Sequence, residues 1–576
     1  MMIKRRSLTL FILFCLFAFE ADAKITYTNI YPVRIIWMSD NSGKYVVNSD
    51  NLLNSFSDQL SVSDNKYTEL MSSDTHQASI LLDFGKEIYG GVKISSAIRD
   101  CKDPVKLRIR FGESVTEAMC DINIPDNPQN PTNEHSLRDF TISAPWLGTV
   151  QCGNSGFRFV RIDLLDKDVK YNLRNISVVS IIRDDEQKGS FCSDNERINR
   201  IWETGVYTVK LNMQEYIWDG IKRDRLVWVG DMHPEVMAIN NAFGDSEVVY
   251  KSLDLVREDT PLPGWMNGMC SYSLWWIIIH RDLYLYQGNL DFLKCQRDYL
   301  YNLVKQIDAK IDKKGVEQLD GTRFLDWPTS ENKDVIHSGL QSLSFMAMKA
   351  AQQIGEYIKD DAIKEIASNC VKRMKNVHVD SFNNSQAAAL NIISGLSLNP
   401  KKDCAIILEN GLDGFSTFYG YYMLEALAMN GKYDEALDLI SKYWGAMLDL
   451  GATTFWEDLK YSDVANAGRI DEIVPENKYD IHSGGGAYCY KGLRLSLCHG
   501  WASGPTSWLT KHVLGVTPVE PGCGTLKIKP NLGPLKSVKG TLPTPYGIVT
   551  INCSKNDKGK VVSDVKAPEG IKIVME

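Results

Sequence analysis

The pattern of hydrophobic and polar positions changes period twice along the chain, and these changes divide it into three parts. Between residues 24 and about 182, apolar and polar residues alternate with a period close to two, in runs such as 78–85, 105–111 and 157–162. Clusters of Asn, Gly and Pro separate these runs, for example at 123–133. Alternating runs bounded by turn residues are typical of half-buried strands. The first part therefore predicts a β-sandwich built from short strands.

From about Ser193 the apolar residues recur with helical spacing instead. Residues 193–196 form a good N-terminal cap, and Ile198, Ile201 and Trp202 follow it on one face of a helix. Further helices are expected near residues 232–243, 271–286, 290–309, 337–357, 361–376, 384–396, 415–430, 433–446, 479–491 and 503–513. With the first one they make about eleven helices, in antiparallel pairs joined by loops of variable length. No internal repeat is detectable in the sequence itself.

Near Gly515 the period returns to that of strands, which are expected at 522–530 and 542–551 around Pro and Gly turns. A chain of 576 residues is too long for a single hydrophobic core and should divide into several domains. We therefore expect an N-terminal β-sandwich over 24–190, a helical domain over 191–514 and a C-terminal β-sandwich over 515–576.

The N-terminus has the pattern of a secretory signal peptide over residues 1–23. Lys4, Arg5 and Arg6 supply the charged region, 7–19 the apolar region, and 21–23 a small-x-small cleavage site. The apolar run is too short for a comfortable membrane span, and no later run approaches that length. We expect the mature protein to be periplasmic or secreted, without a membrane span.

Composition narrows the classes of partner and cofactor. A formal net charge of -8 argues against nucleic acid as a partner, since no strongly basic surface is expected. The twelve cysteines that follow the signal peptide show no CxxC spacing, and the nine histidines include no HExxH motif. No cofactor or metal is predicted. An even number of cysteines permits disulfides in an exported protein, but a chain of this size does not need them, and most are expected to be free.

The segment 218–231 is the most informative part of the chain for function. It places three carboxylates, three basic residues and two tryptophans within fourteen positions, and Gly220 and Gly230 flank the group. The two glycines and the absence of an apolar stripe favour a loop over a helix. Such a loop can bring carboxylates, a guanidinium and flat aromatic faces into one pocket, and these are the groups that can bind and protonate a sugar. The alternative is a solvated surface loop whose charges cancel.

This segment resembles the acid-bearing motif of the bacterial α-L-rhamnosidases of glycoside hydrolase family 78, which reads roughly Asp, spacer, Arg-Asp/Glu, spacer, Trp-x-Gly-Asp. Two later segments are similar to the same family and stand in its order: Gly-Ala-Thr-Thr-Phe-Trp-Glu at 451–457 and Cys-His-Gly-Trp-Ala-Ser-Gly-Pro-Thr at 498–506. The resemblance covers nearly the whole mature chain. It implies that the helices close into an (α/α)6 barrel, and that the protein is an inverting glycoside hydrolase releasing terminal α-L-rhamnose.

The resemblance also implies roles for individual residues. Asp224 takes the place of the general acid, and Glu457 takes the place of the general base. The residues that would bind the hydroxyl groups of the sugar or form a wall beside it are Asp219, Arg223, Asp231 and Trp228. Many members of the family carry Glu where this chain has Asp224, so the acid is one methylene shorter here. Asp219 and Asp231 stay open as alternative acids.

Other candidates for the substrate pocket rest on weaker signals. They occur where loops at the barrel mouth are expected: Trp265, Trp276, Asp326, Trp327 and His499. Trp275 and Trp276 lie in a continuous apolar run, so at least one of them is expected in the core. A lone histidine such as His499 is more often a satisfied core residue than a ligand.

Two rival functions remain open at this point. A glycosidase of the same fold could act on another deoxy sugar or on a uronic acid, and the latter should show extra Arg or Lys at the barrel mouth. A catalytically inactive carbohydrate-binding protein is the other alternative, although carboxylates at both catalytic positions argue against it. In each case the partner is a carbohydrate, and the sequence leaves the oligomeric state unknown.

Overall fold

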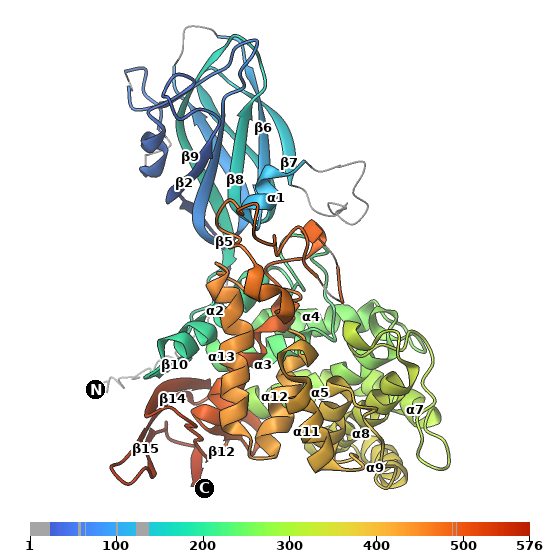
Figure 1. Cartoon of the computed structure of the whole chain (residues 1–576). Helices are drawn as coiled ribbons and strands as arrows, with labels where there is room; N and C mark the ends of the chain where they lie inside the picture. The colour runs from blue at the N-terminus through green and yellow to red at the C-terminus, as the bar shows by residue number, and fades with distance from the viewer. Residues whose placement is uncertain are drawn as a thin grey trace, which may run out of the picture.

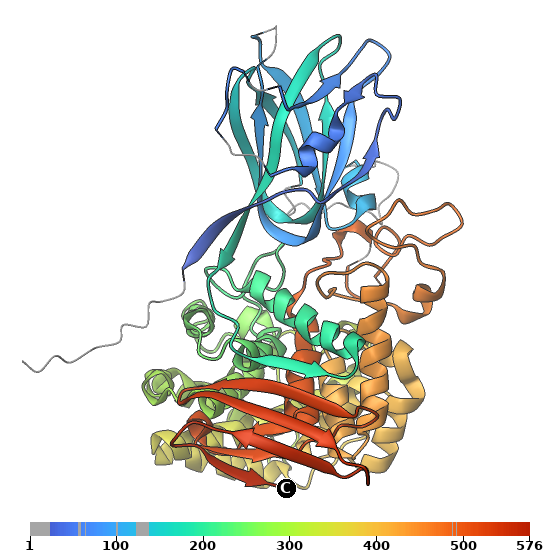
Figure 2. The same cartoon turned by 90° about the vertical axis from the view of Figure 1, so that its left-hand side faces the viewer.

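The computed structural model describes residues 24–55, 59–63, 65–98, 102–121, 138–486, 488–490 and 492–576. The predicted signal peptide and the predicted turn at 123–133 lie outside the described residues. A β domain formed by the first part of the chain stands at one end of a larger helical domain (Figure 1). The C-terminal strands lie against the side of the helical domain, away from the N-terminal β domain (Figure 2).

The strands of the N-terminal part form one antiparallel sheet of nine strands. The strands are β1 (Ile25–Ile30), β2 (Arg34–Met38), β3 (Val46–Val47), β4 (Thr68–Met71), β5 (Ser79–Ser96), β6 (Val105–Gly112), β7 (Asp139–Ala144), β8 (Gly148–Leu164) and β9 (Lys170–Arg183). Their order is β3-β4-β9-β5-β8-β6-β7, with β1 paired to β9 and β2 paired to β5. β5 and β8 have 18 and 17 residues, so they are longer than the short strands that the sequence predicts.

Apolar side chains from the long strands meet in the core of this domain, as the alternation predicts. Ile94 of β5, Ile109 of β6, Phe157 of β8 and Ile176 of β9 are fully buried in one cluster. The lower end of the domain carries the short helix α1 (Val115–Met119), which Ser114 caps by accepting a hydrogen bond from the Glu117 amide. α1 lies beside the loops of the helical domain (Figure 1).

The helical domain contains thirteen α-helices after α1 within the described residues. They are α2 (Glu196–Asn212), α3 (Met232–Ala242), α4 (Glu247–Glu258), α5 (Cys270–Gln287), α6 (Leu290–Cys295), α7 (Arg297–Ala309), α8 (Lys333–Ile358), α9 (Asp361–Met374), α10 (Ser385–Ser394), α11 (Pro400–Asn410), α12 (Gly420–Met429), α13 (Tyr433–Asp449) and α14 (Gly504–Trp508). The mixed architecture of sheets and many helices is confirmed. Closure of the helices into an (α/α)6 barrel and the two-layer form of the N-terminal domain stay predictions. No helix among the described residues is long and apolar enough to cross a bilayer.

One expected helix is wrong, and two observed helices were not expected. The described residues of 479–491 form turns and bends, because three consecutive glycines at 484–486 interrupt the segment and Gly486 has a φ of 89°. α4 and α11 were not predicted. α11 begins directly after Asn399, whose side chain accepts a hydrogen bond from the Lys402 amide and so caps the helix.

The C-terminal strands form two small sheets. β13 (Ser537–Thr544), β14 (Gly547–Lys555) and β15 (Val561–Lys566) continue a four-stranded sheet whose first strand is β10 (Ser190–Ser193). β11 (Val516–Pro518), β12 (Thr525–Ile528) and β16 (Lys572–Met575) form the other sheet. β10 is part of the connection between the N-terminal sheet and α2, and it pairs with β13 from the far end of the chain (Figure 2). The C-terminal part is therefore joined to the beginning of the helical domain by backbone hydrogen bonds.

Candidate active site

The segment 218–231 is a loop between α2 and α3, as the sequence predicts. Its two arms are tied together, since the Asp219 amide donates to the Leu226 carbonyl at 3.1 Å and the Leu226 amide donates to Asp219 Oδ1 at 3.0 Å. At the tip, Asp224 and Arg225 have φ values of 52° and 53°. A non-glycine residue in this left-handed region costs roughly 1–2 kcal/mol. The tip that carries the predicted acid is therefore strained and depends on its surroundings to hold its shape.

Arg223 connects the two predicted catalytic carboxylates. Its side chain is 1% exposed. Nη1 donates to Asp224 Oδ2 at 3.0 Å, Nη2 donates to Glu457 Oε2, and Nε donates to the Arg494 carbonyl at 2.8 Å. A guanidinium presents its donors in a rigid planar fork, so the positions of both carboxylates are set relative to each other. The predicted acid and the predicted base thus share one cation.

Glu457 is held by further donors. The Ser496 amide donates to Oε2 at 3.0 Å, and the Cys489 thiol lies 3.0 Å from Oε1. Burial raises the pKa of Glu457, but the charges of Arg223 and His499 outweigh this effect and bring the pKa down to about 2. Glu457 is therefore ionised in this state, which is the form that a general base requires.

Two further carboxylates of the loop are buried beside it. Burial raises the pKa of Asp219 to about 7. Burial also raises the pKa of Asp231, which accepts a hydrogen bond from the Tyr272 hydroxyl at 2.7 Å. His499 Nε2 lies 3.4 Å from Asp231 Oδ2. Burial lowers the pKa of His499, but Glu457 and the two aspartates outweigh it and raise the pKa overall.

Gly500 allows the segment 498–506 to approach the carboxylates of the loop. The Gly500 amide donates to the Asp219 carbonyl at 2.9 Å, and Gly220 and His499 form an isolated β-bridge. A Cβ atom at position 500 would lie 1.6 Å from Glu235 Oε1. Glycine is therefore required for the segment 498–506 to pass between the loop and the first turn of α3.

Asp326 and Trp327 share a narrow cavity with Glu457. The residues that line it are Asp326, Trp327, Pro328, Ser416, Thr417, Phe418, Glu457, Asp458, Tyr488, Cys489 and Trp501. Asp326 Oδ2 accepts a hydrogen bond from the Ser416 hydroxyl at 2.5 Å, and burial raises the pKa of Asp326 to about 7. The cavity therefore combines an ionised carboxylate, a carboxyl group with a raised pKa and several aromatic faces.

Trp276 and Trp265 take other places, whereas Trp228 stays beside the loop carboxylates as a predicted wall residue. Trp276 is fully buried, and its Nε1 donates to the Leu253 carbonyl at 3.2 Å, so it has no surface to offer a substrate. Trp276 is a core residue, and so is Trp275. Trp265 donates to Asp320 Oδ1 at 2.9 Å. Trp228 is half-buried and packs edge-on against Tyr272.

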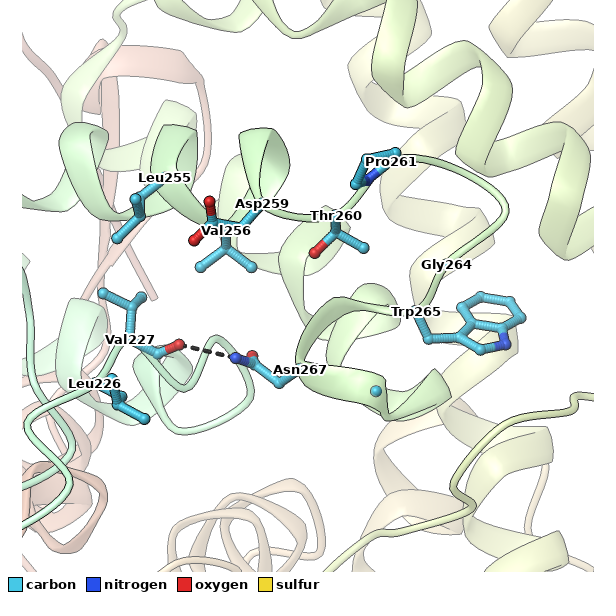
Figure 3. Close-up of a pocket in the computed structure, with 11 residues that line it drawn as sticks. Leu226, Val227, Leu255, Val256, Asp259, Thr260, Pro261, Gly264, Trp265 and Asn267 are labelled. Carbon is cyan, nitrogen blue, oxygen red and sulfur yellow. Dashed lines mark hydrogen bonds between the residues drawn. The ribbon is translucent and has the colours of Figure 1, made fainter. Parts of the chain in front are cut away.

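Trp265 belongs to a second cavity, of about 430 Å³ (Figure 3). Leu226 and Val227 of the loop form one wall of this cavity, and the ring of Trp265 points away from its centre. Asn267 donates from its side-chain amide to the Val227 carbonyl at 3.0 Å and accepts from the Val229 amide at 3.1 Å. These bonds hold the part of the loop at Val227 and Val229 in place and do not involve the predicted catalytic carboxylates.

Several residues of the site were not expected from the sequence. Cys489 approaches Glu457, and the Tyr490 ring lies 4.1 Å from the Arg223 guanidinium carbon. Both belong to the segment for which a helix is expected, and only its irregular path brings them to the site. Lys222 was visible in the loop motif, but its acidic partners stand more than a hundred residues earlier in the chain.

One group among the described residues has the geometry of a cation site: Glu113, Glu117 and His482, with candidate ligand atoms within 4.8 Å of one another. The ammonium of Lys222 lies 3.0 Å from Glu113 Oε2 and 3.1 Å from Glu117 Oε1. An internal cation therefore already occupies the place where these carboxylates would bind a metal ion.

Known proteins share this architecture. Residues 186–389 match the family model of the bacterial alpha-L-rhamnosidase 6 hairpin glycosidase domain, and residues 515–575 match that of the bacterial alpha-L-rhamnosidase C-terminal domain. An alpha-L-rhamnosidase of Formosa agariphila is 21% identical over 536 residues, which cover 82% of this chain and 54% of that protein. The chain thus spans about half the length of this curated relative.

Solved structures of rhamnosidases have a similar fold. The GH78 family rhamnosidase of Bacillus sp. GL1 superposes with a TM-score of 0.69 at 19% identity, over 89% of this chain and 54% of that one. The rhamnosidase of Klebsiella oxytoca, solved with rhamnose bound, gives a TM-score of 0.64 at 18% identity, over 84% of this chain and 96% of that one. The resemblance to bacterial alpha-L-rhamnosidases that the sequence motifs indicate is thereby confirmed, and residues 186–389 and 515–575 match the models of two domains of these enzymes.

Proposed function

We propose that this protein is an inverting glycoside hydrolase that releases terminal α-L-rhamnose from glycosides or polysaccharide side chains. The observation that carries the proposal is the bridge from Asp224 through Arg223 to Glu457. Glycoside hydrolysis needs one carboxylic acid beside the leaving oxygen and a second carboxylate opposite it. In this chain the two carboxylates stand on either side of one guanidinium. We further propose that the chain is exported by its N-terminal signal.

We propose the inverting route because the three sequence motifs resemble those of a family of inverting enzymes. Inverting enzymes hold their two carboxyl groups about 6.5–9.5 Å apart, so that a water molecule fits between the sugar and the base. The pKa of Glu457, lowered to about 2, keeps this carboxylate ionised, so it is free to accept a proton from this water.

Asp224 is proposed to donate the proton to the leaving oxygen. In the free protein it is paired with Arg223, so it has to exchange this partner for a proton before it acts. We propose that the hydroxyl groups of the bound sugar draw the Arg223 donors away from Asp224. Asp219 and Asp326, whose pKa values are raised to about 7, are proposed to bind sugar hydroxyl groups in either protonation state. Asp224 then becomes the proton donor, and Glu457 stays ionised next to Ser496.

The lining of the narrow cavity supports a neutral deoxy sugar over a uronic acid. It contains the three carboxylates Asp326, Glu457 and Asp458, and it contains no Lys or Arg among the lining residues that the structure describes. Arg223 neutralises Glu457 from outside this lining, and the remaining carboxylates would repel the negative charge of a uronic acid. Trp327, Phe418 and Trp501 supply apolar faces for the methyl group of rhamnose, although such a contact gives only modest selectivity.

The test is a panel of p-nitrophenyl glycosides with the purified wild-type protein. We expect cleavage of the α-L-rhamnoside and no comparable cleavage of the α-L-fucoside or the β-D-glucuronide. Glu457→Gln protein, purified in the same way, controls for contaminating glycosidases. Proton NMR of the first product should show β-L-rhamnose, because inversion changes the anomeric configuration. Cleavage of another glycoside instead would overturn the sugar, and initial release of α-L-rhamnose would overturn the inverting mechanism.

A further inference from the structure

The Lys222 ammonium lies in a buried cluster at the boundary between the N-terminal β domain and the helical domain. Its side chain is 1% exposed, and those of Glu113 and Glu117 are 0% and 1% exposed. The ammonium also donates to the Leu493 and Leu495 carbonyls, each at 2.8 Å. Two carboxylates and two carbonyls thus surround one ammonium, which accounts for all three of its protons and leaves no room for bulk water.

The remaining members of the cluster are arranged around this cation. His482 Nε2 lies 3.0 Å from the Leu495 carbonyl, which can only accept, so the proton is on Nε2 and Nδ1 accepts from the Ser114 hydroxyl at 2.7 Å. Burial lowers the pKa of His482 to about 4, which agrees with this neutral form. The positive charges of this cluster are therefore those of two residues. Lys222 contacts both Glu113 and Glu117, and Arg138 Nε lies 3.8 Å from Glu117 Oε1.

The cluster touches both segments that carry the predicted catalytic residues. Lys222 directly precedes Arg223 and the strained residues Asp224 and Arg225. Glu113 accepts a hydrogen bond from the Leu497 amide at 2.6 Å, next to Ser496, whose amide donates to Glu457. A single buried cluster thus links the predicted acid, the predicted base and the N-terminal β domain.

A glycine on β8 allows this close approach. A Cβ atom at Gly156 would lie 2.8 Å from the Ile221 carbonyl carbon and 2.8 Å from the Lys222 amide nitrogen. The strand therefore runs directly against the backbone of the loop, immediately before the residues with positive φ. The β domain supports the loop both by this backbone contact and by the two carboxylates that receive the Lys222 side chain.

We propose that Lys222 is a positioning residue, and that the N-terminal β domain acts through Glu113 and Glu117 to hold the loop tip and the Glu457 segment in their active arrangement. The inference rests on the proposed function for its effect on turnover, but not for its effect on the loop. Strain at Asp224 and Arg225 would relax once Lys222, two residues before Asp224, lost its anchor. A displacement of about 1 Å in a catalytic group is enough to lower the rate on the order of 100-fold.

The experiment separates positioning from stability with two variants. Lys222→Met leaves Glu113 and Glu117 buried without their ammonium, so both the Tm and kcat should fall. The double variant Lys222→Met with Glu117→Gln removes one of the two carboxylate charges and should recover most of the Tm. We expect its kcat to stay about 100-fold below that of the wild type, because the anchor is still missing. Recovery of kcat together with the Tm would overturn the proposal.

Arg34→Met serves as the matched control for contacts between the domains. Arg34 Nη2 donates to the Asp471 carbonyl at 2.8 Å, across the same boundary but away from the loop. This variant should lower the Tm and leave kcat unchanged. If it lowers kcat as strongly as the double variant does, general docking of the domains and not Lys222 governs the rate.

Hydrogen exchange gives a readout that does not depend on turnover. The Arg225 amide donates to the Arg223 carbonyl at 2.6 Å, and the Leu226 amide donates to Asp219. In the double variant both amides should exchange faster than in the wild type, whereas amides of the α8 helix should not change. Unchanged exchange in the loop would overturn the proposal even if the wild type cleaves no glycoside. Faster exchange in a protein without turnover would instead contradict only the proposed function.

Discussion

Arg223 and Glu457 form a buried ion pair between two segments that are 234 residues apart in the chain. Their side chains are 1% and 2% exposed. The same guanidinium reaches Asp224, so the pair places the predicted base in a defined relation to the predicted acid.

Loss of the Arg223 charge should shift the acidic limb of the pH–rate profile. Arg223 is the main cause that lowers the pKa of Glu457 against the opposing effect of burial. In Arg223→Met the pKa of Glu457 should rise, and a base with a raised pKa loses its charge at a higher pH. We expect the acidic limb of kcat/KM to move to higher pH and kcat to fall about 100-fold or more.

Arg223→Lys is the control that keeps the positive charge but loses the planar geometry of the guanidinium. A lysine keeps a positive charge near Glu457 but cannot bind two carboxylates with a planar fork. The acidic limb should therefore stay closer to that of the wild type, while kcat remains low. An unchanged acidic limb in Arg223→Met would contradict the assignment of Glu457 as the base.

Asp219 should make the stability of the protein depend on pH between about 4 and 7. Burial raises its pKa to about 7, so the folded state favours the neutral form. The stabilising contribution is complete below the ordinary pKa of an unfolded aspartate, about 3.9, and is lost as the pH rises through about 7. The difference is on the order of 4 kcal/mol, from about 1.4 kcal/mol for each pKa unit.

Asp219→Asn should therefore be more stable than the wild type at pH 8 and should lose part of the slope of Tm against pH. Glu457 does not interfere in this window, because its lowered pKa confines its own effect to lower pH. Asp438→Asn on the exposed face of α13, with a side chain 56% exposed, controls for the loss of a carboxylate at the surface. A slope that is the same in Asp219→Asn and the wild type would show that the carboxyl group is not held in its neutral form.

How much of the fold and of the site can be predicted from the sequence depends on whether neighbouring residues or tertiary contacts determine each feature. The loop at 218–231 is predictable, because Gly220 and Gly230 interrupt any helix and no apolar stripe opposes this. In the segment with Cys489 and Tyr490 the three glycines at 484–486 already argue against a helix, but the path of the segment is not predictable, because contacts with Arg223 and Glu457 from other parts of the chain set it. Spacing of apolar residues carries no information about such contacts.

The same limit applies to the aromatic residues. The continuous apolar run around Trp275 and Trp276 predicts a core position for at least one of them but does not show which one, and both are completely buried. Trp327 lies among mixed apolar and polar neighbours and lines the cavity with Glu457. The burial of both residues of the run comes from the tertiary packing of α5. α4, in contrast, is predictable from the sequence. Its apolar residues Val248, Val249, Leu253 and Val256 repeat with helical spacing and are all buried.

Trp327 and Trp276 should respond differently to truncation. Trp327→Ala removes an aromatic face from the cavity and should raise KM about tenfold, which corresponds to about 1.4 kcal/mol. Trp276→Ala opens a hole in the core and should cost about 3–5 kcal/mol of stability with little effect on KM. Chemical denaturation and steady-state kinetics on both variants check this. A large change of KM in Trp276→Ala would return that residue to the substrate site.

Cys489 should make turnover sensitive to a small thiol reagent. Its thiol lies 3.0 Å from Glu457 Oε1, and burial together with the Glu457 charge raises its pKa well above the usual range. Methyl methanethiosulfonate should therefore react slowly and inactivate the protein as it adds a methylthio group beside the base. Reduction with dithiothreitol should restore activity, and free L-rhamnose should slow the reaction.

Cys489→Ala is the matched variant for this experiment. The exposed Cys192 and Cys295 remain available to the reagent in that variant, but their modification should not affect turnover. If Cys489→Ala is inactivated at the same rate as the wild type, another cysteine is responsible and the position of the thiol beside the base has no consequence for function.

The most direct test of the central claim is the dependence of rate on the leaving group in Asp224→Asn and Glu457→Gln. A missing acid matters most when the leaving group is a poor one, whereas a missing base matters for every substrate. With p-nitrophenyl α-L-rhamnoside and a rhamnosyl disaccharide, Asp224→Asn should lose far more activity on the disaccharide, by about 100-fold or more. Glu457→Gln should lose activity equally on both. Near-normal hydrolysis of the disaccharide by Asp224→Asn, or retained turnover in Glu457→Gln, would contradict the account.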